Sequence, residues 1–169
     1  ILKNYSEEKL HKMFEQYGEV TNAKTLAKTI VLKRHTTAML SINEFKIALH
    51  DVVKGNPNKY FAQVFQAIRI ELNDELGALK EMLQQIPALL KPAGRIAIIT
   101  FHSLEDRLVK NFFKTGIFEE TETDEIYGTK LQSEFKIITK KPITPGEQEL
   151  KNNSRTRSAK LRIAEQIEN

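Results

Sequence analysis

The chain has 169 residues, of which 40% are hydrophobic and 28% are charged, a composition typical of one globular domain or two small ones. It has no cysteine, which excludes disulfides, zinc fingers and thiol catalysis, and its apolar runs are too short to span a bilayer. No signal peptide is visible, so we expect a cytoplasmic protein with no membrane partner.

Charge is distributed unevenly along the chain, although the net value is only +4. Lys and Arg outnumber Asp and Glu by ten to six in residues 1–60 and by eight to four in residues 136–169. In residues 61–135 the acidic side chains lead by twelve to eight. Two basic ends suit contact with a polyanion. Ordinary solvated lysines produce the same pattern, so charge alone decides nothing.

The first third of the sequence has the apolar spacing of short helices, predicted over residues 6–17, 22–33 and from 42 onward. Ser6 can cap the first, and Ser41 with Glu44 forms a capping box for the third. The segment 55–58, Gly-Asn-Pro-Asn, breaks the pattern. Residues 1–54 therefore predict an all-helical module.

A longer helical pattern occupies residues 60–85. Within it, Asn73 and Asp74 mark either a break or a turn that merely faces solvent. Pro87 is expected to start a last short turn that ends at Leu90.

The pattern changes after Lys91, where a turn precedes a β-branched run over residues 95–101. The run does not alternate, which predicts a strand buried on both faces. Ser103 and Asp106 form a capping-box pattern for the helix that follows. Helix, turn, buried strand and helix in this order are typical of an α/β fold.

The last third is predicted to begin with an acidic loop over residues 115–133. The elements expected after it are a strand over 135–139, a short helix opened by Thr144, Pro145 and Glu147, a polar loop over 152–158 and a final strand over 159–164.

Four stretches together resemble the MraW/RsmH family, bacterial enzymes that methylate N4 of a cytidine in 16S rRNA. They are residues 5–8 (YSEE), 65–76 with FQAIRI and NDEL, 94–107 (GRIAIITFHSLEDR), and 141–145 with 154–162 (KPITP and SRTRSAKLR). The resemblance runs nearly end to end. The family pattern usually has Gly where Ala93 stands and Pro where Ser154 stands, and residues 34–59 follow it only loosely.

The resemblance implies that this chain is the C-terminal portion of such a methyltransferase. The family binds S-adenosylmethionine through a Gly-rich loop and acidic residues of an upstream half, and no such loop occurs in these residues. We therefore expect no cofactor-binding residue in this chain, no metal, and no activity of the fragment alone. The expected domains are a helical insertion for RNA recognition over 1–59 and the later half of the methyltransferase domain over 60–169.

The fold class implied is α/β: part of a class I (Rossmann-like) methyltransferase, plus the all-helical insertion module. Class I enzymes place strands five, seven and six side by side, with strand seven antiparallel to its neighbours. Here these would be residues 95–101, 158–165 and 134–140, in a three-stranded mixed sheet with the final strand in the middle. The first strand would have an open edge, so we expect dimerisation or pairing with the absent segment.

His102 is the one candidate for a catalytic role, because ligands gather where the strands of an open α/β sheet end. The alternative is a structural histidine that bonds the start of the next helix. Ser103 and Asp106 are interpreted as helix caps. Glu105 and Arg107 could form a surface ion pair, the default for such residues, or reach RNA.

Basic side chains near the C-terminus are the candidates for contact with RNA phosphates, namely Arg155, Arg157, Lys160 and Arg162. They could equally tie the C-terminus to acidic residues of the same chain. Lys24, Lys28, Lys33 and Arg34 could give the helical module a basic face, or simply a solvated one.

The expected partner is 16S rRNA or the small ribosomal subunit. A different class of function stays open, a stand-alone RNA-binding or interaction module without catalysis. The upstream reading frame separates the two, because only the methyltransferase requires a Gly-rich loop there.

Overall fold

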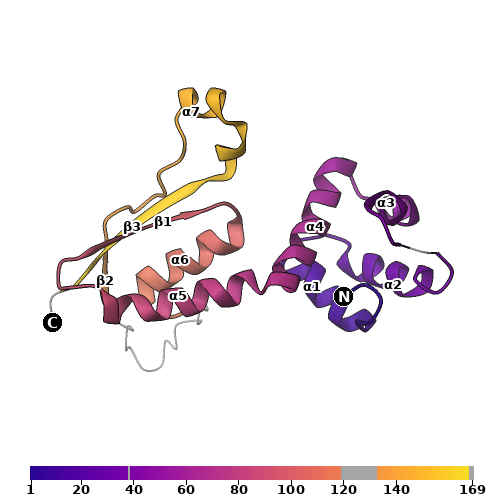
Figure 1. The fold of residues 1–169 in the computed structure, drawn as a ribbon, viewed down its shortest axis with the longest axis horizontal. Helices are drawn as coiled ribbons and strands as arrows, with labels where there is room; N and C mark the ends of the chain where they lie inside the picture. The colour runs from indigo at the N-terminus through magenta and orange to yellow at the C-terminus, as the bar shows by residue number, and fades with distance from the viewer. Residues whose placement is uncertain (38, 119–132, 168–169) are drawn as a thin grey trace. The chain divides into compact units, whose positions relative to one another are not determined.

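The computed structural model describes residues 1–37, 39–118 and 133–167. The chain divides into two compact units, Ile1–Glu75 and Leu76–Asn169, which we call the helical unit and the sheet unit (Figure 1).

The helical unit is built as the sequence predicts, with local side chains starting its helices. Its elements are α1 (Glu7–Gln16), α2 (Ala23–Lys33), α3 (Ile42–Ala48), the 3₁₀ turn η1 (His50–Val52) and α4 (Pro57–Asn73). Ser6 accepts a hydrogen bond from the Lys9 amide, and the capping box of Ser41 and Glu44 is complete. Both predicted caps are confirmed.

A closed apolar core holds the helical unit together. Its centre is formed by side chains with no exposed surface, Leu10, Phe14, Leu26, Ile30 and Val64. Polar contacts tie distant helices around this core: the Tyr5 hydroxyl donates to Glu71 over 2.7 Å, and the Tyr60 hydroxyl donates to Asn22 over 3.0 Å.

The long helical pattern after residue 57 is broken at Asp74, which adopts a left-handed conformation with φ 49°. A second helix, α5 (Glu75–Leu89), follows at once. It continues through Pro87, so the predicted separate turn is wrong. Proline at this position removes one hydrogen bond to the preceding turn, and burial of Leu83 and Ile86 in the core of the sheet unit holds the helix end in place.

The division into compact units falls after Glu75, sixteen residues later than the boundary of 59 and 60 expected for the domains. Residues 57–73 form α4, whose Tyr60, Phe61 and Val64 are buried in the core of the helical unit. The first part of the expected second domain thus packs with the helical unit.

The sheet unit contains three strands, with the chain's last strand in the centre. Its elements after α5 are β1 (Arg95–Thr100), α6 (Ser103–Thr115), β2 (Phe135–Ile137), α7 (Glu147–Asn152), the 3₁₀ turn η2 (Ser154–Ser158) and β3 (Lys160–Gln166). The order is β1-β3-β2, which confirms the predicted central strand. Both pairings are antiparallel, which confirms the orientation expected of the final strand, and the three described strands form an antiparallel sheet rather than a mixed one.

One face of this sheet is covered by α5 and α6, which run along the same side of it (Figure 1). Ile98, Phe135 and Ala164 of the three strands lie in the core beneath them. On the opposite face, Ile99 is 58% exposed. The prediction of a first strand buried on both faces is therefore wrong for the described residues, since only one face has helices against it.

The segment between β2 and β3 starts its helix later than predicted. Ile143 pairs with Leu161 through two backbone hydrogen bonds of 2.9 Å, which keep the chain extended beyond the sheet. The helix α7 therefore begins at Glu147 after Gly146, and Thr144 is not its cap.

The acidic loop expected over 115–133 lies largely outside the described residues, because α6 ends at Thr115 and residues 119–132 are not described. Within the described ranges, no helix combines the length and the apolar character needed to cross a membrane.

Candidate functional site

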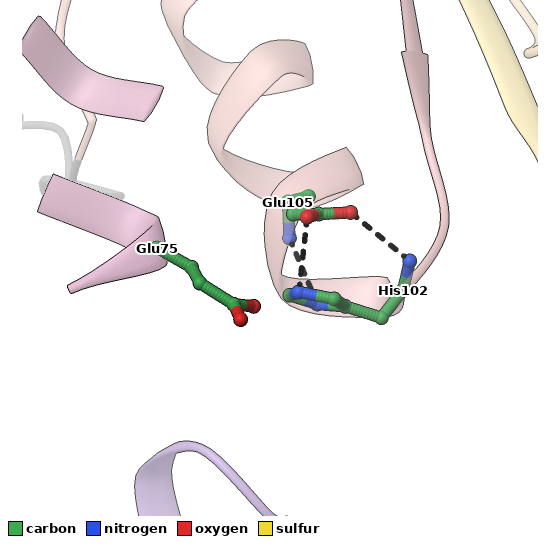
Figure 2. Close-up of side chains that lie close together, drawn as sticks. All are labelled: Glu75, His102 and Glu105. Atoms are coloured by element: carbon green, nitrogen blue, oxygen red, sulfur yellow. Dashed lines mark hydrogen bonds and ion pairs between the residues drawn. The ribbon is translucent and has the colours of Figure 1, made fainter. Parts of the chain in front are cut away.

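The connection between β1 and α6 is a tight turn closed by reciprocal hydrogen bonds. Only Phe101 and His102 separate the strand from the helix. His102 is the N-cap, and its Nδ1 accepts from the Glu105 amide over 3.4 Å. Oε2 of Glu105 accepts in return from the amides of Phe101 (2.8 Å) and His102 (3.2 Å), as Figure 2 shows for the His102–Glu105 pair. The structure therefore shows the alternative role predicted for His102, a hydrogen bond to the start of the next helix.

The second ring nitrogen of His102 is not used by this cap. Because Nδ1 accepts a hydrogen bond, the proton of a neutral ring belongs on Nε2. The side chain is only 8% exposed, and Nε2 lies 3.2 Å from Oε1 of Glu105. That contact lacks hydrogen-bond geometry, and Nε2 has no hydrogen-bond partner among the described residues. At the end of β1, a buried ring nitrogen therefore lies at ion-pair distance from a carboxylate oxygen without a hydrogen bond to it.

The turn also fixes the charge of Glu105. Burial by itself raises the pKa of this carboxyl group. The contacts with the His102 side chain and with the amides of Phe101 and His102 outweigh burial, so the Glu105 pKa lies below its usual value. Glu105 is consequently an anion at neutral pH that holds the turn together.

Ser103 and Asp106 are not the caps of α6, contrary to the sequence interpretation. The cap lies one residue earlier, at His102 with Glu105, because β1 ends at Thr100 and Glu105 captures the two amides that follow. This one-residue shift leaves the Asp106 side chain available for a contact outside its own helix.

Asp106 forms a buried ion-pair cluster with two cations of β3. Its Oδ1 accepts from Nε of Arg162 over 2.6 Å, and its Oδ2 accepts from the same guanidinium over 3.1 Å. Lys160 donates to Oδ2 over 3.2 Å. Burial raises the pKa of Asp106, but the hydrogen bonds from Arg162 and Lys160 outweigh it and the pKa is lowered. The cluster ties the start of α6 to the central strand.

The four predicted RNA-contact residues therefore fall into two pairs. Arg162, with 9% of its side chain exposed, and Lys160 are engaged with Asp106. Arg155 and Arg157 lie in η2, are exposed, and form no ion pair with the residues that the structure describes. Only this second pair presents free guanidinium groups.

Arg155 and Arg157 belong to a segment that projects beyond the sheet, residues 140–158, which we call the basic arm (Figure 1). It contains five Lys or Arg against two Glu. All five cations are exposed: Lys140, Lys141, Lys151, Arg155 and Arg157. The arm is thus the more open of the basic surfaces in the sheet unit.

The cations of the helical unit divide in the same way. Lys33 donates to the carbonyl of Ala48 over 2.7 Å, and Arg34 donates to the carbonyl of Tyr5 over 2.6 Å. Lys24 and Lys28 are exposed on α2. Two of the four residues considered for a basic face are therefore occupied in joining helices.

The turn between β1 and α6 has no feature of a loop that holds a nucleoside cofactor such as S-adenosylmethionine. The turn after β1, where an α/β sheet would receive one, contains no glycine. The amides of Phe101 and His102 are already bonded to the Glu105 carboxylate, so neither is free to donate to a ligand. No cofactor-dependent step can be derived from these residues.

Residue types alone would have located part of this site. Phe-His-x-x-Glu has the spacing of a capping box, with His in place of Ser or Thr. The role of Asp106 has no such local signal, because its partner Arg162 is 56 positions away.

Comparison with known proteins finds similarity over almost the whole chain. The MraW methylase family matches residues 1–167. Proteins named ribosomal RNA small subunit methyltransferase H are similar over 98–99% of the chain: that of Azobacteroides pseudotrichonymphae with 53% identity, that of Amoebophilus asiaticus with 50% and that of Parabacteroides distasonis with 45%. The chain spans about half of these relatives, 53–55% of their lengths.

Proposed function

Because the chain belongs to the MraW methylase family, we propose that it is part of an enzyme that methylates N4 of a cytidine in 16S rRNA, with S-adenosylmethionine as the methyl donor. The observation that carries this proposal is the match over residues 1–167, together with relatives at 45–53% identity that are named as small-subunit rRNA methyltransferases. Its partner would be 16S rRNA or the small ribosomal subunit, in the cytoplasm.

The strand order supports the assignment of the sheet unit to a methyltransferase fold. We propose that β1, β3 and β2 are strands five, seven and six of a class I (Rossmann-like) sheet, since the last strand lies between the other two. The helical insertion for RNA recognition over 1–59 and the methyltransferase half over 60–169 stay predictions.

The methyl donor would be held by residues outside this chain. In support, the sequence of these residues contains no Gly-rich loop of the kind that holds a nucleoside. We expect the 169-residue polypeptide alone to bind no S-adenosylmethionine in calorimetry and to transfer no methyl group. Micromolar binding would contradict this placement.

The basic arm is the part of the sheet unit best suited to rRNA. Arg155 and Arg157 are exposed and unpaired within the described ranges, and a guanidinium fork matches two phosphate oxygens. Lys160 and Arg162 stay predictions as RNA contacts, although their pairing with Asp106 favours a structural role for both.

The test of the main proposal is a transfer assay with the complete gene product. It would be incubated with radiolabelled S-adenosylmethionine and small ribosomal subunits, and the nucleosides would be identified by mass spectrometry after digestion. We expect N4-methylcytidine as the product. Methylation at another atom, or none, would refute the assignment.

The same experiment distinguishes the main proposal from the second candidate function, a stand-alone RNA-binding module. The favouring observation is the exposed cations of the basic arm. A complete gene product that binds RNA and transfers no methyl group would support this alternative.

The role of the arm can be measured through the salt dependence of RNA binding. Substituting Arg155 and Arg157 with Ala should weaken affinity and reduce the slope of log K against log salt by about 0.7–0.9 for each phosphate that the variant no longer neutralises. Substituting Lys24 and Lys28 of α2 with Ala measures the contribution of the helical unit in the same way. A slope lowered only by the α2 pair would contradict the proposal for the arm.

A further inference from the structure

The N-cap of α6 is an unusual choice of residue for the task it performs. Ser, Thr, Asp and Asn cap helices best, and each would accept the Glu105 amide hydrogen as Nδ1 of His102 does. What an imidazole adds is a second nitrogen on the far side of the ring. The capping role therefore explains one nitrogen of His102 and leaves the other unexplained.

That second nitrogen is in a costly state. Nε2 belongs to a side chain that is 8% exposed, and it lies 3.2 Å from Oε1 of Glu105 but makes no hydrogen bond with any described residue. Leaving a buried donor unsatisfied costs about 1–3 kcal/mol, and such groups in native proteins call for an explanation. A Ser or Asn cap would avoid this cost.

The surrounding turn holds the ring in one tautomer and one orientation. Nδ1 is occupied by the Glu105 amide, and the Glu105 carboxylate fixes the amides of Phe101 and His102, through which the backbone enters the turn (Figure 2). The result is a rigid N–H donor. It stands at the end of β1, the edge at which α/β sheets receive their ligands.

We propose that His102 contacts the target base, donating a hydrogen bond from Nε2–H to an acceptor on the Watson–Crick edge of the cytosine. This inference rests on the proposed function. Enzymes that modify a base take it out of the stack and recognise it by hydrogen bonds to that edge. In cytosine the acceptors N3 and O2 share this edge with the N4 amine, so a single fixed donor orients the amine without competing for it. Glu105 is then a positioning residue that acts through His102.

The experiment separates the capping role of Nδ1 from the proposed donor role of Nε2 in the same side chain. In the complete gene product, His102→Ser and His102→Asn keep a capping oxygen and remove the distal N–H, whereas His102→Ala removes both. We expect the Ser and Asn variants to keep the melting temperature and the affinity for RNA, and to lose about tenfold to a hundredfold in kcat/KM for methyl transfer. The Ala variant should lose thermal stability in addition.

Wild-type turnover by Ser and Asn variants would overturn the inference and leave His102 as a cap. Failure of the wild-type protein itself to form N4-methylcytidine would instead refute the proposed function. If the variants do not fold, ¹⁵N-histidine NMR of the wild-type protein decides: Nε2 should carry the proton, and its resonance should move when the substrate RNA is added. An unmoved resonance would overturn the inference.

Discussion

The two units of this chain differ in how their apolar cores are enclosed. The helical unit closes around Phe14 and Leu26, which have no exposed surface. The sheet unit covers one face of its sheet with α5 and α6, while Ile99 and Phe101 stay 58% and 56% exposed. Burial of apolar area is the main favourable term in folding. The helical unit leaves Leu40, Ile47 and Leu72 exposed as well, at 91%, 75% and 69%, so the two units differ in how their cores are enclosed rather than in the amount of apolar surface they bury.

Polar groups are also used differently in the two units. The helical unit uses neutral or partly exposed contacts, such as Tyr60 to Asn22, to join its helices. The sheet unit depends on a buried ion pair between Asp106 and Arg162, where a missing partner would leave an isolated charge. The sheet unit should consequently be the more sensitive to pH.

The largest effect is expected in the core of the helical unit. Phe14→Ala should cost about 4 kcal/mol, because it removes a fully buried ring at the meeting point of the helices. Hydrogen exchange should show reduced protection in α1, α2 and α4, with α6 and β3 unchanged. Equal reductions in both units would show that they unfold as one.

The second effect concerns the ion pair of the sheet unit. Asp106→Asn should cost about 3 kcal/mol, because Arg162 would stay buried without its counter-charge. Glu165→Gln is the matched control, since its partner Arg95 is 66% exposed and a solvent-screened pair contributes much less than a buried one. Chemical denaturation monitored in β3 measures both. Similar losses in the two variants would contradict a special role for Asp106.

Acid should destabilise the sheet unit through the same carboxylate. The pKa of Asp106 is lowered in the folded state, so its contribution is complete above the unfolded value of about 3.9 and disappears as pH falls below it toward the folded pKa. A pH titration of the unfolding free energy should show this loss in the native chain. The loss should be absent from Asp106→Asn, and an unchanged titration in that variant would refute the assignment.

The sequence predicted what neighbouring residues determine. Ser6 and Ser41 cap their helices because each contacts an amide three residues away, and the strand order followed from the family resemblance. The start of α6 was misplaced by one residue, since Ser103 is a better cap by type than His102. The residue at which β1 ends determines which of the two caps the helix, and the local sequence does not indicate that residue.

Long-range partners were beyond sequence reasoning. Asp106 lies in the FHSLEDR stretch and Arg162 in the SRTRSAKLR stretch, and each was interpreted without the other. The structure shows that these two distinctive stretches meet in one ion pair. No local pattern indicates which of the four predicted RNA-contact residues is buried. In the structure, Arg162 is buried against Asp106, whereas Arg155 is exposed.

A smaller, favourable effect is expected in the turn before β1. Ala93 has φ 60°, a left-handed conformation that costs an L-residue with a Cβ about 1–2 kcal/mol. The family pattern usually has Gly there. Ala93→Gly should raise the stability of the sheet unit by about 0.5–1 kcal/mol, after the greater flexibility of unfolded glycine is subtracted. Thermal unfolding measures it, and a destabilised variant would show that the backbone strain is relieved elsewhere.

The smallest effect should come from the uncovered face of the sheet, and it tests the opening comparison most directly. Ile98 and Ile99 are adjacent in β1 and differ in exposure, 9% against 58%. Ile98→Thr should cost about 2 kcal/mol, because it places a hydroxyl in the core beneath α6, whereas Ile99→Thr should change stability by less than about 0.5 kcal/mol. Ile99→Thr should also reduce any self-association seen by light scattering, since an exposed apolar face beside a strand edge promotes it. Repeating both substitutions in the complete gene product shows whether further protein covers this face. There, a cost for Ile99→Thr that rises toward that of Ile98→Thr would mean that the sheet is completed by residues outside this chain.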